Sequence, residues 1–231
     1  MGDPLANVVW EALTTNHAAF ADGDGPARRY EPDVSVFAGM ADDGAGSWHA
    51  LGELVGPGRS GVLFREAAVE APDGWTVVMA GQGHQMVLTS PLASVDSVDS
   101  PPIVELGDAD APEMRALVKL TEPGPFGART HELGGYVGIR DPADGGLLAM
   151  AGRRTSVPGF TEISAVCTHP QARRRGYGEA VTTAVAQRLL DDGITPFLHV
   201  ALSNDNARRV YERLGFTVRR ITNFTVVRTP G

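Results

Sequence analysis

The chain has 231 residues, 42% of them hydrophobic and 21% charged, which is typical of an ordinary globular protein and argues against a disordered one. A net charge of −8 at pH 7 argues against nucleic-acid binding, because that function needs a broad basic surface. A single cysteine, Cys167, excludes an internal disulfide framework. No apolar stretch reaches the length of a membrane span, and the N-terminus lacks the pattern of a signal peptide, so we expect a cytoplasmic protein.

Residues 1–90 are predicted to form a small α+β domain. Their apolar pattern predicts two helices, at 5–20 and 47–55, and four strands, at 34–38, 61–64, 75–80 and 85–89. The glycines at 56, 58 and 61 match a dinucleotide-binding pattern, but they follow a helix and precede a strand, so we interpret them as a turn. No other motif in this part indicates a function.

A break in the apolar pattern separates this part from the rest of the chain. Ser, Asp and Pro dominate residues 91–102, which we predict to be a linker. Residues 103–231 are predicted to form a second domain with the order β-α-β-β-β-α-β-α-β. The expected strands are 103–106, 136–140, 147–153, 161–168, 196–202 and 224–228, and the expected helices are 111–120, 178–190 and 204–214. The predicted fold class is therefore α/β (α+β).

The segment 162–180 predicts an anion-binding loop. It reads as a strand, a turn rich in arginine and a helix entered through Gly176 and Gly178. Backbone N–H groups at a helix N-terminus bind anions, and glycines let a ligand approach the backbone closely. Arg173, Arg174 and Arg175 add positive charge.

Two motifs resemble those of the GNAT superfamily of acyl-CoA-dependent N-acetyltransferases. The pattern Arg173-x-x-Gly176-x-Gly178 resembles the pyrophosphate-binding signature of that family. The segment 204–216, with Asn204, Ala207 and Tyr211 followed by Gly-Phe, resembles the C-terminal helix of the same family. The resemblance implies a mixed, mostly antiparallel sheet with helices on both faces, and acetyl-CoA as co-substrate without a metal.

The resemblance also implies roles for individual residues. Tyr211 would protonate the departing CoA thiolate, and a backbone N–H near Val166 or Cys167 would stabilise the oxyanion. The residues expected to bind CoA are Val166, Cys167, Thr168, Arg173, Arg174, Arg175, Gly176, Tyr177, Gly178, Glu179, Asn204 and Ala207. A purely structural interpretation is open for two of them, because Tyr211 falls on the apolar stripe of its helix and Asn204 is a good N-cap.

Glu162 is the candidate general base. It lies eleven residues before Arg173, which resembles the spacing of the catalytic glutamate in histone-acetylating members of the family. A carboxylate near its reference pKa of roughly 4.3 is a weak base for an ammonium group, so the role requires a shifted pKa or a bridging water. The alternative is a polar residue on the solvated face of a strand.

The Pro- and Gly-rich loop at 122–135 is the candidate acceptor region. Phe126, Arg129 and His131 are the candidate substrate contacts, and the alternative is a rigid connection with solvated polar groups. Arg153 and Arg154 end a predicted strand, where they form either surface charge or part of the acceptor mouth.

The leading hypothesis is an N-acetyltransferase that moves an acetyl group from acetyl-CoA to a primary amine by direct attack on the thioester. The alternative is a catalytically silent CoA-binding sensor. The expected partner is a small-molecule or peptide amine, with no nucleic acid and no membrane, and a homodimer is an open possibility. The N-terminal domain would be either a degenerate copy of the GNAT fold or a lid over the acceptor site.

Overall fold

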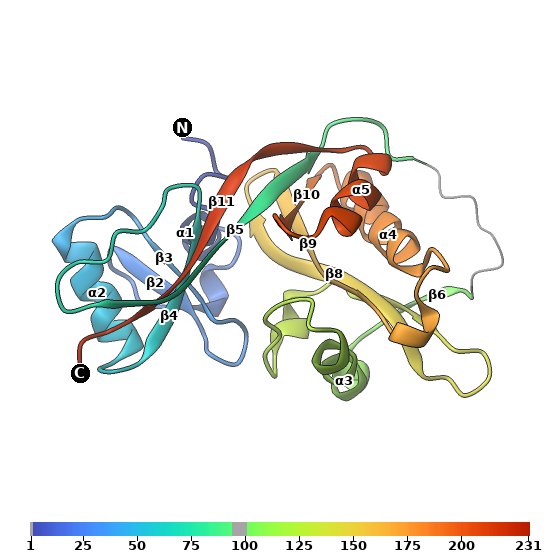
Figure 1. The fold of residues 1–231 in the computed structure, drawn as a ribbon, viewed down its shortest axis with the longest axis horizontal. Helices are drawn as coiled ribbons and strands as arrows, with labels where there is room; N and C mark the ends of the chain where they lie inside the picture. The colour runs from blue at the N-terminus through green and yellow to red at the C-terminus, as the bar shows by residue number, and fades with distance from the viewer. Residues whose placement is uncertain (1, 94–100) are drawn as a thin grey trace.

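A computed structural model describes residues 2–93 and 101–231, which form one eleven-stranded mixed sheet flanked by helices (Figure 1). The N-terminal half contains α1 (Val8–Thr14), β1 (Ala21–Asp22), β2 (Ala27–Tyr30), β3 (Phe37–Met40), α2 (Ala45–Val55), β4 (Ser60–Arg65) and β5 (Thr76–Leu88). The C-terminal half contains β6 (Ile103–Glu105), α3 (Ala111–Thr121), β7 (Val137–Arg140), β8 (Leu147–Val157), β9 (Phe160–Thr168), α4 (Tyr177–Asp191), β10 (Thr195–Ala201), α5 (Asp205–Arg213) and β11 (Phe216–Arg228). The element order predicted for residues 103–231 is confirmed.

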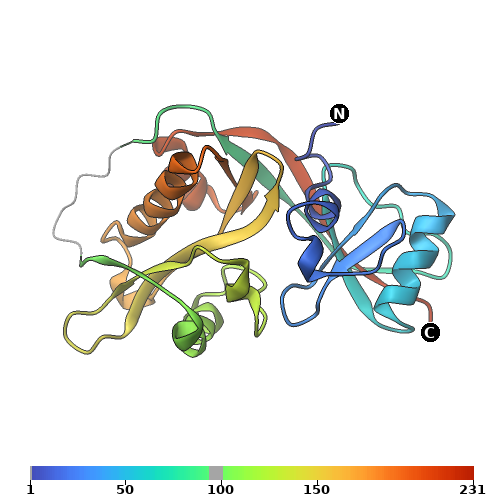
Figure 2. The same cartoon turned by 180° about the vertical axis from the view of Figure 1, so that it is seen from behind.

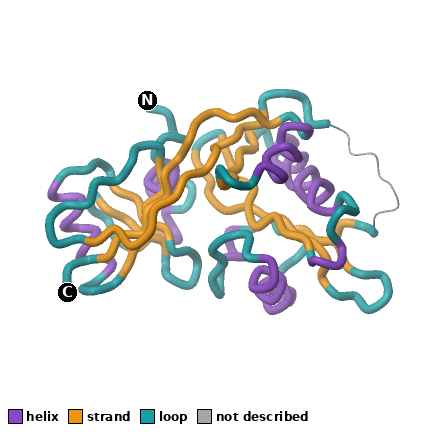
Figure 3. The backbone as a smooth tube through the Cα atoms, viewed as in Figure 1, coloured by secondary structure: helices purple, strands orange, loops and turns teal. Residues whose placement is uncertain are grey.

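Two long strands join the halves. The strand order is β1-β2-β3-β4-β11-β5-β10-β9-β8-β7-β6, and β5 and β11 pair with each other along most of their thirteen residues (Figures 2 and 3). β5 also pairs with β10, and β11 also pairs with β4, so each half is completed by a strand from the other half of the sequence. The division into two domains stays a prediction, and residues 94–100 of the predicted linker lie outside the described part of the chain.

Helices cover both faces of the C-terminal half of the sheet, as the fold class predicts. α4 and α5 lie on one face and α3 lies on the other (Figures 1 and 2). α4 buries Val181, Val185 and Leu189, which recur every four residues and form one apolar stripe. This packing places the start of α4 beside the C-terminal end of β9, where Gly178 lies next to Thr168.

The predicted helix at 5–20 is wrong in its second half. α1 ends at Thr14, and a 3₁₀ turn at 18–20 leads into β1. The hydroxyls of Thr14 and Thr15 donate to the carbonyls of Trp10 and Glu11, at 2.8 and 2.6 Å. Such bonds back to the helix compete with its own ladder and favour an end there.

The two strands predicted at 75–80 and 85–89 are one continuous strand, β5. It runs from Thr76 to Leu88 through the glycines at 81 and 83. Gly83 allows β10 to approach closely, because a Cβ at this position would lie 2.9 Å from the carbonyl oxygen of Val200. β11 likewise begins at Phe216, well before the predicted start at 224.

Candidate active site

Two parallel strands separate at the centre of the C-terminal half and open a cleft. β9 and β10 pair only from Phe160 with Thr195 to Ile163 with Leu198. Beyond this point the strands line a cavity of about 830 Å³, with Ser164 to Thr168 on one side and His199 to Ala201 on the other. A second cavity of about 440 Å³ shares part of this lining and extends to the start of α4. Together the cavities form one cleft along β9.

A β-bulge lies in the wall of the cleft. The pairing of β8 with β9 passes from Met150 opposite Cys167 to Gly152 opposite Ser164, so Ala165 and Val166 together face a single residue. Ala165 has a φ of 53°, a left-handed conformation that costs about 1–3 kcal/mol in a residue other than glycine. A bulge leaves backbone groups unpaired with the neighbouring strand, so this segment can offer N–H groups to a ligand.

The loop before α4 has the geometry of an anion site. Arg174 and Gly176 have φ values of 64° and 77°, and α4 begins directly after them at Tyr177. No side chain in the described part of the chain caps α4, so the first N–H groups of this fifteen-residue helix remain available to a ligand. The predicted anion-binding loop therefore has both the helix N-terminus and the left-handed turns that such a site needs.

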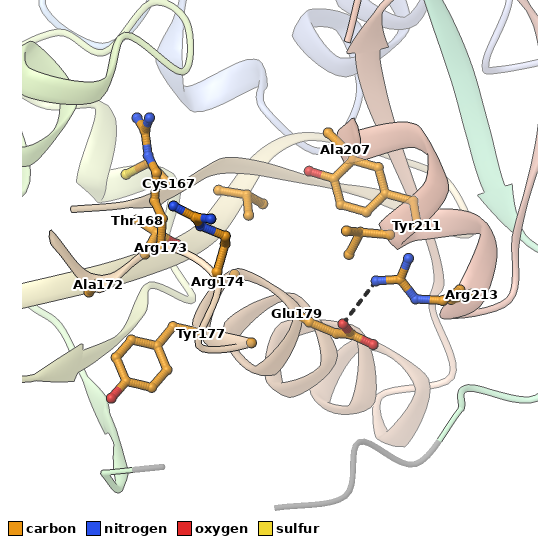
Figure 4. Close-up of a pocket in the computed structure, with 14 residues that line it drawn as sticks. Cys167, Thr168, Ala172, Arg173, Arg174, Tyr177, Glu179, Ala207, Tyr211 and Arg213 are labelled. Carbon is orange, nitrogen blue, oxygen red and sulfur yellow. Dashed lines mark hydrogen bonds and ion pairs between the residues drawn. The ribbon is translucent and has the colours of Figure 1, made fainter. Parts of the chain in front are cut away.

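The cleft brings together most of the residues predicted to bind CoA. Arg173 and Arg174 rise from the loop beside the start of α4 and line both cavities, and Glu179 pairs with Arg213 at 3.3 Å (Figure 4). Arg175 is exposed and lies outside both linings. The predicted CoA-binding residues that do line the cleft are Val166, Cys167, Thr168, Arg173, Arg174, Gly176, Tyr177, Gly178, Glu179, Asn204 and Ala207.

Tyr211 contributes to the core and to the cleft at once. Its ring packs edge-on against Phe216, with a centroid distance of 6.2 Å. Its hydroxyl points from α5 across the pocket toward β9 (Figure 4). Burial raises the pKa of Tyr211 to about 12, so the hydroxyl stays protonated at neutral pH and can donate a proton. Asn204 caps α5 by accepting from the N–H of Ala207 at 3.1 Å and also lines the larger cavity.

Glu162 is fully buried and held by two partners. Arg154 donates to its carboxylate from Nε at 3.0 Å and from Nη2 at 2.5 Å, and His199 donates from Nδ1 at 2.6 Å. Burial alone would raise the pKa of Glu162, but Arg154 and His199 outweigh it and hold that pKa below its ordinary value. The carboxylate is a weaker base than a free glutamate, and it does not line the cleft.

His199 connects Glu162 to the N-terminal half. Burial lowers the pKa of His199, so its ring is neutral and Nε2 accepts from the side-chain amide of Gln85 at 3.2 Å. The same amide donates to the carbonyl of Leu5 at 3.0 Å. The ring of Phe64 on β4 lies edge-on to His199, with a centroid distance of 4.4 Å. The polar groups beneath the cleft are thus shared between both halves.

The predicted acceptor contacts lie outside the cleft. Phe126 packs edge-on against Tyr136 with a centroid distance of 5.7 Å, Arg129 pairs with acidic side chains, and Nε2 of His131 lies 3.3 Å from a carboxylate oxygen of Asp108. None of the three is among the residues that line the two cavities. The loop instead contributes its first residues, Glu122 and Pro123.

Cys167 has no features of a nucleophile. The residue is buried, and burial raises the pKa of its thiol to about 11, so the reactive thiolate is scarce at neutral pH. Because Cys167 lies on β9 beside the cleft, its backbone rather than its thiol can form hydrogen bonds to a ligand.

Sequence reasoning missed the buried network under the cleft. Arg154 and His199 lie on β8 and β10, either side of Glu162 on β9, and Gln85 lies on β5. Alternation along each strand places a residue on a face, but only the strand order brings these four side chains together. The sequence offers only a weak signal, namely single polar residues such as Glu162 and His199 inside otherwise apolar strands.

Comparisons with known proteins agree with this geometry. The family model described as FR47-like protein matches residues 136–225. A mycothiol acetyltransferase of Mycobacterium leprae is 38% identical over 66 residues, which cover 26% of this chain and 21% of that protein. The chain thus matches only about a fifth of the length of that relative.

Two solved structures resemble the whole chain. A GCN5-related N-acetyltransferase of Kribbella flavida has a TM-score of 0.64 at 21% identity, covering 98% of this chain and 96% of the other, and shows the fold alone. A protein of Novosphingobium aromaticivorans, described as an acetyltransferase from the GNAT family, has a TM-score of 0.90 at 34% identity, covering 100% of both chains. The chain therefore belongs to the GNAT family of acetyltransferases.

Proposed function

We propose that this protein transfers an acetyl group from acetyl-CoA to a primary amine by direct attack on the thioester. The observation that carries the proposal is the continuous cleft, which joins an uncapped helix N-terminus, a bulged strand and the Tyr211 hydroxyl. The helix N-terminus can bind a pyrophosphate, and the bulged strand can offer an N–H group to the thioester carbonyl. The Tyr211 hydroxyl can protonate the departing thiolate. A silent CoA sensor would not need Tyr211 to face the cleft.

Different residues of the cleft would bind different parts of the CoA molecule. The N–H groups at Tyr177, Gly178 and Glu179, with the side chains of Arg173 and Arg174, would hold the pyrophosphate. The side of β9 that faces β10 would pair with the amides of pantetheine from Val166 to Thr168, because in the described part of the chain β10 pairs with β9 only as far as Ile163.

The chemistry balances without a covalent intermediate on the protein. A neutral amine attacks the thioester carbonyl, and a C–N bond forms as the carbonyl becomes an oxyanion. A backbone N–H near Val166 or Cys167 would stabilise that oxyanion. As the C–S bond breaks, Tyr211 gives its proton to the thiolate and is reprotonated from water, while the amine loses its extra proton to water.

The role of Glu162 as general base stays a prediction, and its environment favours another role. Its oxygens are occupied by Arg154 and His199, and its pKa is lowered rather than raised. We propose that Glu162 positions Arg154 and that water accepts the proton of the amine.

The proposed acid can be tested by removing one oxygen. Tyr211→Phe keeps the ring in the core but removes the proton donor, so kcat should fall at least tenfold while the Kd of CoA changes little. The rate is followed as thiol released from acetyl-CoA with a panel of primary amines. Tyr136→Phe is a matched control, because Tyr136 is buried outside the cleft.

An unchanged kcat in Tyr211→Phe would remove Tyr211 from the mechanism. Tight CoA binding without thiol release for any amine would instead support the sensor.

A further inference from the structure

Arg154 lies at the end of the cleft farthest from the anion-binding loop. Its partner Glu162 is six residues before Thr168 on β9, which corresponds to about 20 Å along an extended strand. Arg154 is among the residues that line the 830 Å³ cavity. It therefore stands where the acceptor, rather than the CoA pyrophosphate, has to bind.

One nitrogen of the Arg154 guanidinium remains available. Nε and Nη2 donate to Glu162, whereas Nη1 has no hydrogen-bond partner in the described part of the chain and is not sealed from solvent. The side chain is 15% exposed, although the carboxylate beside it is fully buried. The exposed part of this arginine thus faces the cleft with unused N–H donors.

The guanidinium is also held rigidly. Its central carbon lies 5.2 Å from the ring centroid of Phe37 and 6.0 Å from that of Phe64, both contributed by the N-terminal half. His199 fixes Glu162 from the other side. A donor that is pre-organised in this way loses little entropy when it binds a ligand.

The charge of the cleft favours an anionic ligand. The lining of the 830 Å³ cavity contains three arginines and a single acidic residue, Glu122, although the whole chain carries a net charge of −8. Arg173 and Arg174 lie at the proposed pyrophosphate site, which leaves Arg154 without an assigned ligand. Among the described residues that line this cavity, Glu122 is the one carboxylate, because Glu162 is buried outside the lining and His199 is neutral.

We propose that Nη1 of Arg154 binds a carboxylate of the acceptor, so that the substrate is an amine that also carries a carboxylate. This inference rests on the proposed function and narrows its acceptor. The N-terminal half serves the reaction by supplying the aromatic rings that hold Arg154.

The test compares matched amines on the protein saturated with CoA. Glycine, β-alanine and 4-aminobutyrate are each titrated against the corresponding carboxamide, with NMR line shifts giving Kd. Separately, KM is measured with acetyl-CoA as donor. At least one carboxylate should bind tenfold or more tightly than its carboxamide. Equal affinities within all three pairs would overturn the proposal.

Variants assign the preference to Arg154. The double variant Arg154→Met/Glu162→Gln removes both buried charges together, and it should abolish the preference by raising Kd for the carboxylates only. Arg153→Met is the matched control, because Arg153 pairs with Asp192 outside the cleft and should leave the preference intact. A preference that survives in the double variant contradicts the proposal.

A further variant and a binding measurement without turnover distinguish a failed fold from a failed proposal. Arg154→Lys retains the positive charge next to Glu162 but loses the planar guanidinium with its several N–H donors, so it should also lose the carboxylate preference. This variant replaces the double variant if the double variant does not fold. Binding is measured without turnover, so a carboxylate preference with no acetyl transfer would support this inference while refuting the proposed function.

Discussion

Burial changes what the carboxylate of Glu162 can do. The spacing from Arg173 predicts a base, yet the residue is completely buried and shares its oxygens between Arg154 and His199. A buried ion pair contributes little net stability, but removing one partner is strongly destabilising because the other charge stays buried. Such a pair suits a residue that fixes the position of a neighbour.

Glu162→Gln should therefore affect stability more than chemistry. We expect a loss of about 3–5 kcal/mol in the free energy of unfolding, because Arg154 keeps its charge without a counter-ion. The shape of the pH–kcat profile should not change if water accepts the amine proton. Chemical denaturation and a pH–rate profile measure both effects. A hundredfold fall in kcat that recovers at high pH would restore Glu162 as the base.

His17 gives the fold a sensitivity to acid. It is buried, and its Nδ1 lies 2.8 Å from the hydroxyl of Tyr30. Burial lowers the pKa of His17 from 6.5 to about 4, although Glu162 nearby opposes the shift. The folded state thus favours the neutral ring. The stabilising contribution is complete above pH 6.5 and is lost as the pH falls toward 4.

The lowered pKa of His17 corresponds to a contribution of about 3 kcal/mol to the free energy of unfolding. Between pH 6.5 and pH 4, the free energy of unfolding should therefore fall less in His17→Gln than in the natural chain, because the variant has no imidazole at this position to protonate. His49→Gln is a matched control, because the side chain of His49 is 77% exposed. Parallel pH profiles for the natural chain and His17→Gln would contradict the assignment.

The long strands β5 and β11 make the two halves depend on each other. β5 completes the C-terminal half beside β10, and β11 completes the N-terminal half beside β4. Neither half has its full set of strands without the other. The prediction of two domains came from the apolar pattern, which cannot show which strands pair.

Unfolding should therefore occur in a single transition. The three tryptophans, at 10, 48 and 75, all lie in the N-terminal half, so their fluorescence reports that half. Loss of CoA binding reports the C-terminal half. Both probes should give the same denaturation midpoint. Two separated midpoints would show that the halves fold independently, as the two-domain prediction requires.

The sequence predicts local elements better than their assembly. Gly176 and Gly178 mark the anion loop, and the spacing of Val181, Val185 and Leu189 marks α4. Ala165 carries no signal for its left-handed conformation, because a positive φ is expected of glycine and not of alanine, and the bulge in which it lies is seen only in the pairing with β8. Gln85 escapes prediction, and Arg154 is predicted only as surface charge or as part of the acceptor mouth, because the partners of both residues lie on other strands.

The whole sheet has an approximate internal symmetry. β3, α2 and β4 form a parallel unit in the N-terminal half, as β9, α4 and β10 do in the C-terminal half. At the start of α2, Asp42 accepts from the N–H of Gly44 at 2.8 Å and from the hydroxyl of Ser47 at 2.7 Å. A carboxylate thus lies where the other half offers an anion site, and of the two alternatives for the N-terminal half we propose the degenerate copy of the GNAT fold.

We propose that this chain moves an acetyl group from acetyl-CoA to the nitrogen of an amine. The direct measurement is mass spectrometry of amines incubated with the protein and acetyl-CoA labelled in its acetyl group. We predict labelled acetyl on the amine nitrogen, most abundant for amines that carry a carboxylate, and strongly reduced by Tyr211→Phe. Binding of acetyl-CoA with no labelled product from any amine, including those that carry a carboxylate, would contradict the claim.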